Sequence, residues 1–135
     1  MTGAAGTNLI ELMVVAIVVS VLAILGVFQS MRAVERGQAA EATHYLAVLR
    51  GAQMRYRAAS GGMYAGLLSD LDVELQASLP RWGAPALSAP AATGLATLTR
   101  NSGTYAGQTL GISYSTGTLC GTFEPLQSLP ACAAD

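Results

Sequence analysis

Residues 9–28 form an almost uninterrupted apolar run near the N-terminus. They read LIELMVVAIVVSVLAILGVF, in which Glu11 is the only charged residue and Ser20 the other clearly polar one. About 20 apolar residues is the length that a helix needs to cross a bilayer. A helix that is apolar on every side lies in lipid or is packed on all faces by other chains. The run therefore predicts a membrane-linked or self-assembling protein.

A removable secretory signal peptide is the alternative for this run. Such peptides have a basic segment, an apolar core of about 7–15 residues and a small-residue cleavage site. Here no Lys or Arg precedes the run, the run is longer than that core, and no Ala-x-Ala sequence follows Phe28. The pattern favours a helix that stays in the protein.

The helical pattern continues past the run in an amphipathic form. No proline occurs before Pro80, so nothing forces the helix to end after Phe28. The Ser-Gly-Gly sequence at residues 60–62 supplies a helix end. We expect one helix over residues 8–59, about 75 Å long at about 1.5 Å per residue. Its second half has an apolar stripe made of Met31, Val34, Ala42, Tyr45, Leu49, Ala52 and Tyr56.

The remaining residues predict a short helix and a small sheet. Ser69, followed by Asp70 and Asp72, is typical of a helix start, and leucines then recur every fourth residue up to Pro80. A loop rich in Pro, Ala and Gly follows. Strands are expected at residues 94–100, 109–115 and 118–124, with turn sequences between them. Short connections favour an antiparallel meander that covers the stripe of the long helix, an α+β fold.

The composition excludes several classes of protein. Charged residues are 11% of the chain, against roughly 25% in a typical soluble domain, and hydrophobic residues are 52%. Disorder is excluded, because disordered chains are charged and poor in apolar residues. The net charge of −1 leaves no basic field for a nucleic-acid backbone, so no specific nucleic-acid partner is expected. The length allows one domain.

Few side chains are available for catalysis. The chain has one histidine, His44, and two cysteines. His44 lies in the middle of the expected helix, and no Ser, Cys and acid constellation is recognisable around it. A solvated or packed histidine is the better interpretation. We therefore expect no catalytic residue, no cofactor and no enzymatic activity.

The sequence GTNLIELMVV, from Gly6 to Val15, resembles the N-terminal motif of type IV pilins and the related pseudopilins. That family has a Gly, a short stretch ending in Leu-Ile-Glu, and then a long apolar helix. Glu11 is the fifth residue after Gly6, which matches the family spacing, whereas Thr7 stands where most members have Phe or Met. The downstream order of long helix, loop, sheet and C-terminal cysteine pair is similar to the family over nearly the whole chain.

The resemblance implies a domain organisation and a processing site. Residues 1–6 correspond to a leader peptide, residues 7–28 to a transmembrane and filament-core helix, and residues 29–135 to a globular pilin domain that includes the amphipathic half of the helix. The implied shape is the pilin lollipop. A prepilin peptidase is expected to cleave between Gly6 and Thr7, with N-methylation of the new amine on Thr7.

The resemblance also implies an assembly role for Glu11. A carboxylate inside a bilayer helix costs about 2.5–3.5 kcal/mol on insertion scales, so it usually has a partner. The ammonium group of Thr7 in one subunit pairs with Glu11 of a neighbour, which offsets desolvation of both charges and fixes the axial register of the helices. The alternative is that Glu11 lies at the membrane surface and reaches water.

Cys120 and Cys132 enclose residues 121–131. In an exported chain, two cysteines at this spacing favour a disulfide over a metal site, since no His or further Cys is near. Two buried free thiols are the alternative. The resemblance adds that pilins often carry an exposed, variable loop that is closed by such a bond.

A group of acids raises the question of calcium, which pseudopilins of secretion systems can bind. Asp70, Asp72 and Glu74 lack the Gly and the distant Glu of an EF-hand loop. Acids at a helix N-terminus explain them better, because the helix dipole favours negative charge there. No metal site is expected.

The function that the resemblance implies is a structural subunit of a type IV pilus, for adhesion, motility or DNA uptake. The monomer is expected in the inner membrane, and assembly machinery then builds it into a helical homopolymer, an extracellular filament at the cell surface. One alternative is a pseudopilin of a type II secretion or related machine, which the cysteine pair disfavours. Another is a single-pass, membrane-anchored binding domain, which the Glu11 motif disfavours.

Overall fold

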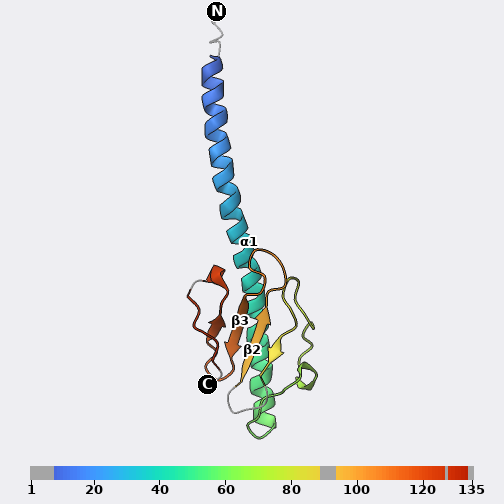
Figure 1. The fold of residues 1–135 in the computed structure, drawn as a ribbon. Coiled ribbons are helices and arrows are strands. Elements are labelled where there is room, and N and C mark those ends of the chain that lie inside the picture. The colour runs from blue at the N-terminus through green and yellow to red at the C-terminus, as the bar shows by residue number, and fades with distance from the viewer. Residues whose placement is uncertain (1–7, 89–93, 127, 134–135) are drawn as a thin grey trace, which may run out of the picture. The chain divides into compact units, whose positions relative to one another are not determined.

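The computed structural model describes residues 8–88, 94–126 and 128–133. The chain divides into two compact units, Met1–Glu35 and Arg36–Asp135. The elements, labelled in part in Figure 1, are helix α1 (Leu9–Ala59), the 3-10 helix η1 (Leu68–Asp70), strands β1 (Ala86–Leu87), β2 (Leu95–Thr99), β3 (Thr109–Ser113) and β4 (Leu119–Gly121), and the 3-10 helix η2 (Glu124–Leu126).

Helix α1 has the bounds that the sequence predicts, to within one residue. At its start, the backbone N–H of Glu11 donates to the carbonyl of Asn8 at 2.8 Å. At its end, Gly61 and Gly62 have φ angles of 71° and 100°. The N–H of Gly62 donates to the carbonyl of Arg57 at 3.0 Å and so satisfies one of the last carbonyls of the helix. Glycine adopts these angles without a steric penalty, and the helix therefore ends at Ala59.

The four strands form one antiparallel sheet in the order β1-β2-β3-β4. The three strands expected from the sequence are confirmed, each shorter than predicted. Strand β1 was not expected, because it has two residues and lies in the segment interpreted as a loop. In the register, Ala96 pairs with Ile112 and Leu98 with Leu110, so these four side chains lie on one face of the sheet.

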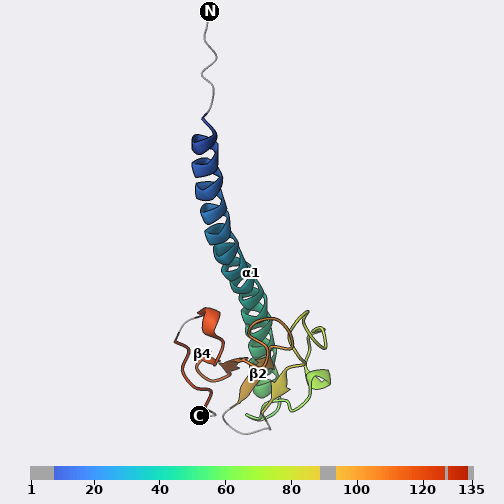
Figure 2. The same cartoon turned by 45° about the horizontal axis from the view of Figure 1, so that its top comes forward.

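That face of the sheet packs against the later half of α1, as Figures 1 and 2 show. The α+β class expected from the sequence is confirmed. All the side chains at the contact are buried, with residual exposures between 0% and 6%. From the helix they are Ala39, Ala42, Tyr45, Leu46, Leu49 and Ala52, and from the sheet Ala96, Leu98, Leu110 and Ile112.

The predicted apolar stripe of α1 is correct only in part. Met31 and Val34 are 64% and 54% exposed. Both belong to the unit Met1–Glu35, in which residues 9–35 are helical and no strand is present among the described residues. The buried stripe begins at Ala39 and includes a residue that was not expected, Gln53.

The segment after α1 is not the α-helix that Ser69 and the following acids predicted. Only the three residues of η1 are helical, and they are followed by Leu71, whose backbone is extended. Burial then alternates over the sequence Leu-Asp-Val-Glu-Leu-Gln at residues 71–76: the three apolar side chains are buried or half-buried and the three polar ones are exposed. Alternating burial with a period of two is typical of an extended chain. The four-residue spacing of the leucines therefore did not reflect a helix.

Candidate functional site

The first half of α1 exposes an unbroken apolar surface. Every residue from 9 to 28 is exposed, and the large apolar side chains among them are between 51% and 72% exposed. Soluble monomers rarely expose a contiguous apolar patch larger than a few hundred Å². Here the surface surrounds the helix on all sides, which calls for lipid or for other helices around it.

Length and composition make α1 a candidate membrane span. It is the one helix of the described chain that is long and apolar enough to cross a bilayer, and none of its most apolar 18-residue window is buried. The core helix of a soluble protein would be mostly buried, unlike this window. An N-terminal targeting sequence would be equally apolar and equally exposed. In lipid, an unbroken helix satisfies its own backbone polar groups. The helix is therefore a candidate anchor.

Two small residues, Ser20 and Gly26, interrupt the run of large apolar side chains. In this structure the helix is continuous through both. The Oγ of Ser20 donates to the carbonyl of Ala16 at 2.7 Å, so its hydroxyl is satisfied within the helix and adds little to the cost of burial in lipid. A Cβ atom at Gly26 would meet nothing within 4 Å.

Glu11 lies in the first turn of α1 and is exposed. An acid in this turn interacts favourably with the positive end of the helix dipole. Within residues 8–88, 94–126 and 128–133, no ion pair to Glu11 is found. The predicted cleavage and methylation site at Gly6 and Thr7 lies outside the described residues.

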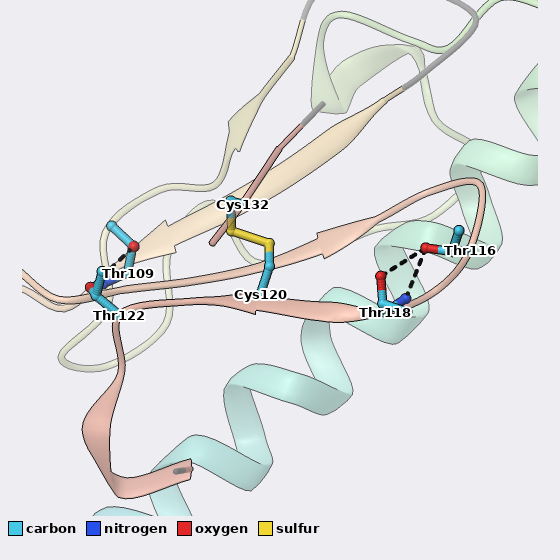
Figure 3. The surroundings of a disulfide bond; sticks show 6 residues. All are labelled: Thr109, Thr116, Thr118, Cys120, Thr122 and Cys132. Atoms are coloured by element: carbon cyan, nitrogen blue, oxygen red, sulfur yellow. Dashed lines mark hydrogen bonds between the residues drawn. A yellow bond between two sulfur atoms is a disulfide. The ribbon is translucent and has the colours of Figure 1, made fainter. Parts of the chain in front are cut away.

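The predicted disulfide is present. The Sγ atoms of Cys120 and Cys132 are 2.03 Å apart, with a Cα–Cα distance of 4.9 Å. Cys120 lies on β4 opposite Gly111 of β3, so its side chain is on the face of the sheet that is turned away from α1. Figure 3 shows Cys132 reaching this outer face from the C-terminal segment.

The loop that the disulfide closes has further attachments. The N–H of Gly121 donates to the carbonyl of Pro130 at 2.9 Å. Thr109 bonds Thr122 through its backbone N–H, at 3.0 Å to the Thr122 Oγ1, where the loop leaves the sheet (Figure 3). Phe123 is buried, with its ring centroid 5.1 Å from that of Trp82 and 5.6 Å from that of Tyr105. The loop is thus held at both ends.

One of the acidic residues at positions 70–74, Asp72, pairs with Arg55. The guanidinium of Arg55 donates to both carboxylate oxygens of Asp72, at 2.7 and 2.8 Å, and this bond holds the pKa of Asp72 below its ordinary value. Both side chains are 58% exposed. No group of three or more potential metal-ligating side chains occurs in the described part of the chain. His44 is exposed on α1.

Two polar residues in the core, Gln53 and Arg100, were missed from the sequence. The side chain of Gln53 accepts from the N–H of Ala65 at 2.8 Å and donates to the carbonyl of the same residue at 3.0 Å. Its spacing of four from Leu49 indicated the buried face, but its polarity argued against it. Tyr114 is also fully buried, and burial raises the pKa of its hydroxyl. The two bonds of Gln53 hold the segment around Ala65 on α1.

Comparison with known proteins gives no match: no family model, no curated protein and no solved structure is similar to this chain at a significant level. Function is therefore inferred from the residues described above. They are the exposed apolar helix with its single acid, and the sheet unit with its disulfide-closed loop.

Proposed function

We propose that this chain is the structural subunit of a filament of the type IV pilus class. The observation that carries the proposal is the first half of α1, which is apolar on all sides, exposed throughout, and carries one acid, Glu11, in its first turn. A helix that only anchors a protein gains nothing from a carboxylate in the apolar segment, because the charge opposes insertion by about 2.5–3.5 kcal/mol. An assembly helix uses it as a contact.

In the proposed cycle, the chain first resides in the inner membrane through residues 7–28. Prepilin peptidase removes residues 1–6, and the amine of Thr7 is methylated. Helices that move from lipid into a bundle gain little from the hydrophobic effect, because lipid tails are as apolar as the helix surface. Close packing and the pairing of Glu11 with the Thr7 ammonium of a neighbour supply the specificity, and an assembly motor supplies the work.

The unit Arg36–Asp135 forms the outer wall of the filament in this proposal. It has its own core between α1 and the sheet, so it does not need a neighbour in order to fold. The described residues of its disulfide-closed loop are exposed or half-buried apart from Phe123, and the loop is covalently tied to β4. An outer wall that bears shear at a cell surface benefits from such a tie, which supports a pilus serving adhesion, motility or DNA uptake.

The proposal is tested by electron microscopy of filaments sheared from cells that express the chain, together with the intact mass of the filament protein. Long filaments composed mainly of this chain, with a mass that starts at a methylated Thr7, are the expected result. Short periplasmic fibres would instead identify a pseudopilin. A chain found only as a membrane-bound monomer that still begins at Met1 would identify a single-pass anchored domain and contradict the proposal.

A further inference from the structure

Arg81 has a backbone conformation that favours glycine. Its φ angle is 67°, and it is the third residue of a turn in which the N–H of Trp82 donates to the carbonyl of Leu79 at 3.0 Å. Pro80 is the second residue of that turn, and a positive φ at the third residue is usually supplied by Gly or Asn. A larger side chain is strained in this conformation, so the fold gains nothing from an arginine at position 81.

The guanidinium of Arg81 points to a contact outside its own chain. The side chain is exposed, and within the described part of the chain no hydrogen bond or ion pair involves it. Other arginines of the unit Arg36–Asp135 are engaged within the chain, namely Arg50, Arg55, Arg57 and Arg100. Backbone strain persists where it serves a function, and here it presents an unpaired cation at the surface.

A groove of about 410 Å³ lies along residues 68–77 of the same unit. Two acids line it. Asp72 already binds Arg55, whereas Glu74 is exposed and no ion pair to it is found among the described residues. The apolar residues of the lining are Leu68, Leu71, Val73, Leu75 and Ala77. An apolar groove with one unpaired carboxylate suits a side chain that has an apolar stem and a cationic end.

We propose that this groove binds Arg81 of a neighbouring copy of the chain, with the guanidinium on Glu74 and the stem against Val73 and Leu75. Charge complementarity selects a second copy, because the unit that carries the groove also carries the unpaired cation. A contact between two different surface patches can repeat from subunit to subunit, as a filament requires. The inference rests on the proposed filament and adds a contact between the outer units to that of the bundled helices.

The test exchanges the charges in the full chain and measures the yield of filaments sheared from cells. Arg81→Glu and Glu74→Arg are each expected to lower the yield about fivefold, the upper end for an exposed ion pair. Co-expression of the two variants should raise the yield above that of either alone, because each supplies the charge that the other lacks. The matched control is Glu124→Arg, which makes the same charge change at an exposed acid outside the groove lining and should leave the yield unchanged.

Arg81→Gly separates the contact from a role in the fold. It removes the strain, so the thermal unfolding midpoint of the full chain in detergent should be unchanged or higher, while the filament yield falls about fivefold. A lower midpoint would show that Arg81 serves the fold and would overturn the inference.

The remaining outcomes separate this inference from the proposed function. Normal yields in Arg81→Glu and Glu74→Arg, or an equal loss in Glu124→Arg, would overturn the contact and leave the filament standing. If the yield recovers only when both substitutions are in one chain, the pair lies within a subunit and the contact between copies is wrong. A wild type that forms no filaments would contradict both the contact and the proposed function.

Discussion

The Sγ of Cys132 lies against Gly111 on the outer face of the sheet, so close that a Cβ atom added to the glycine would come within 2.9 Å of the sulfur. The same Cβ would be 2.9 Å from the carbonyl oxygen of Ala96 and from the Cγ2 of Thr97. Two of these three neighbours, the backbone oxygen and the tethered sulfur, have little freedom to move. The absence of a side chain at Gly111 thus leaves the room that the disulfide needs on this face.

Gly111→Ala is expected to destabilise the sheet unit by about 1–3 kcal/mol, the usual cost of overpacking a filled site. The free energy of unfolding of the full chain in detergent, followed by near-ultraviolet circular dichroism, measures the effect. Gly66→Ala is the matched control, since a Cβ there meets nothing within 4 Å. Equal loss of stability in both variants would contradict the account of the outer face.

Cys132→Ser is expected to lower the free energy of unfolding by roughly 3 kcal/mol, the value for closure of a loop of this size in the chain-entropy model. A reductant should lower the stability of the wild type by a similar amount and leave the variant unchanged. Membrane insertion should be unaffected, because it depends on residues 9–28. A wild type that is indifferent to the reductant would show that the bond does not stabilise the unit.

Gln53→Ala is expected to cost at least about 2 kcal/mol, because it leaves the buried N–H and carbonyl of Ala65 without their side-chain partner. The measurement is again the free energy of unfolding. Gln29→Ala, an exposed position of the same helix, should change stability by only a few tenths of a kcal/mol. If both variants are equally stable, Gln53 does not hold the loop on α1.

The bounds of α1 and three strands could be predicted because each depends on local sequence. The glycines after Ala59 impose the helix end, and Asn101, Gly103 and Gly117 mark the turns between strands. The segment after Ser69 was predicted wrongly. Leucines that are four residues apart fit one face of a helix, and they fit equally well one face of an extended chain, in which every second side chain points the same way. The burial of Leu71 in the core, with Val73 and Leu75 packed against that core, decides between the two periods.

Part of the candidate functional site could be predicted from the sequence, and part could not. The apolar run and the disulfide follow from residue type and spacing alone. The contact of Cys132 with Gly111, and the burial of Phe123 against Trp82, depend on strand register and on a loop that returns to the sheet. No local pattern encodes such long-range contacts, so they could not be derived from the sequence.

The exposed ion pair predicts a small pH effect. Because Arg55 holds the pKa of Asp72 below its ordinary value, the stabilisation is present above the ordinary carboxyl pKa and is lost as the pH falls through the lowered one. Arg55→Gln should raise the pKa of Asp72, as measured by carboxyl carbon NMR. Arg57→Gln is the control, since Arg57 bonds Gly62 and Tyr64. An unchanged titration in Arg55→Gln would contradict the pair.

The central claim is that Glu11 is an assembly contact. Glu11→Val removes the only charge from the apolar run, so insertion should be at least as favourable as in the wild type, by about 2.5–3.5 kcal/mol on insertion scales. The sheet unit and its disulfide should be unchanged, because both belong to the unit Arg36–Asp135 and residue 11 belongs to the unit Met1–Glu35. Glu41→Val is the matched control, since Glu41 is an exposed acid in the later half of α1.

The most direct measurement counts surface filaments and membrane-bound monomer in the same cells for the wild type, Glu11→Val and Glu41→Val. Loss of filaments in Glu11→Val with the monomer retained in the membrane, and normal filaments in Glu41→Val, are the predicted results. Normal filaments in Glu11→Val would show that the carboxylate is a surface residue with no part in assembly. Loss of the membrane-bound monomer along with the filaments would likewise contradict a register contact between subunits.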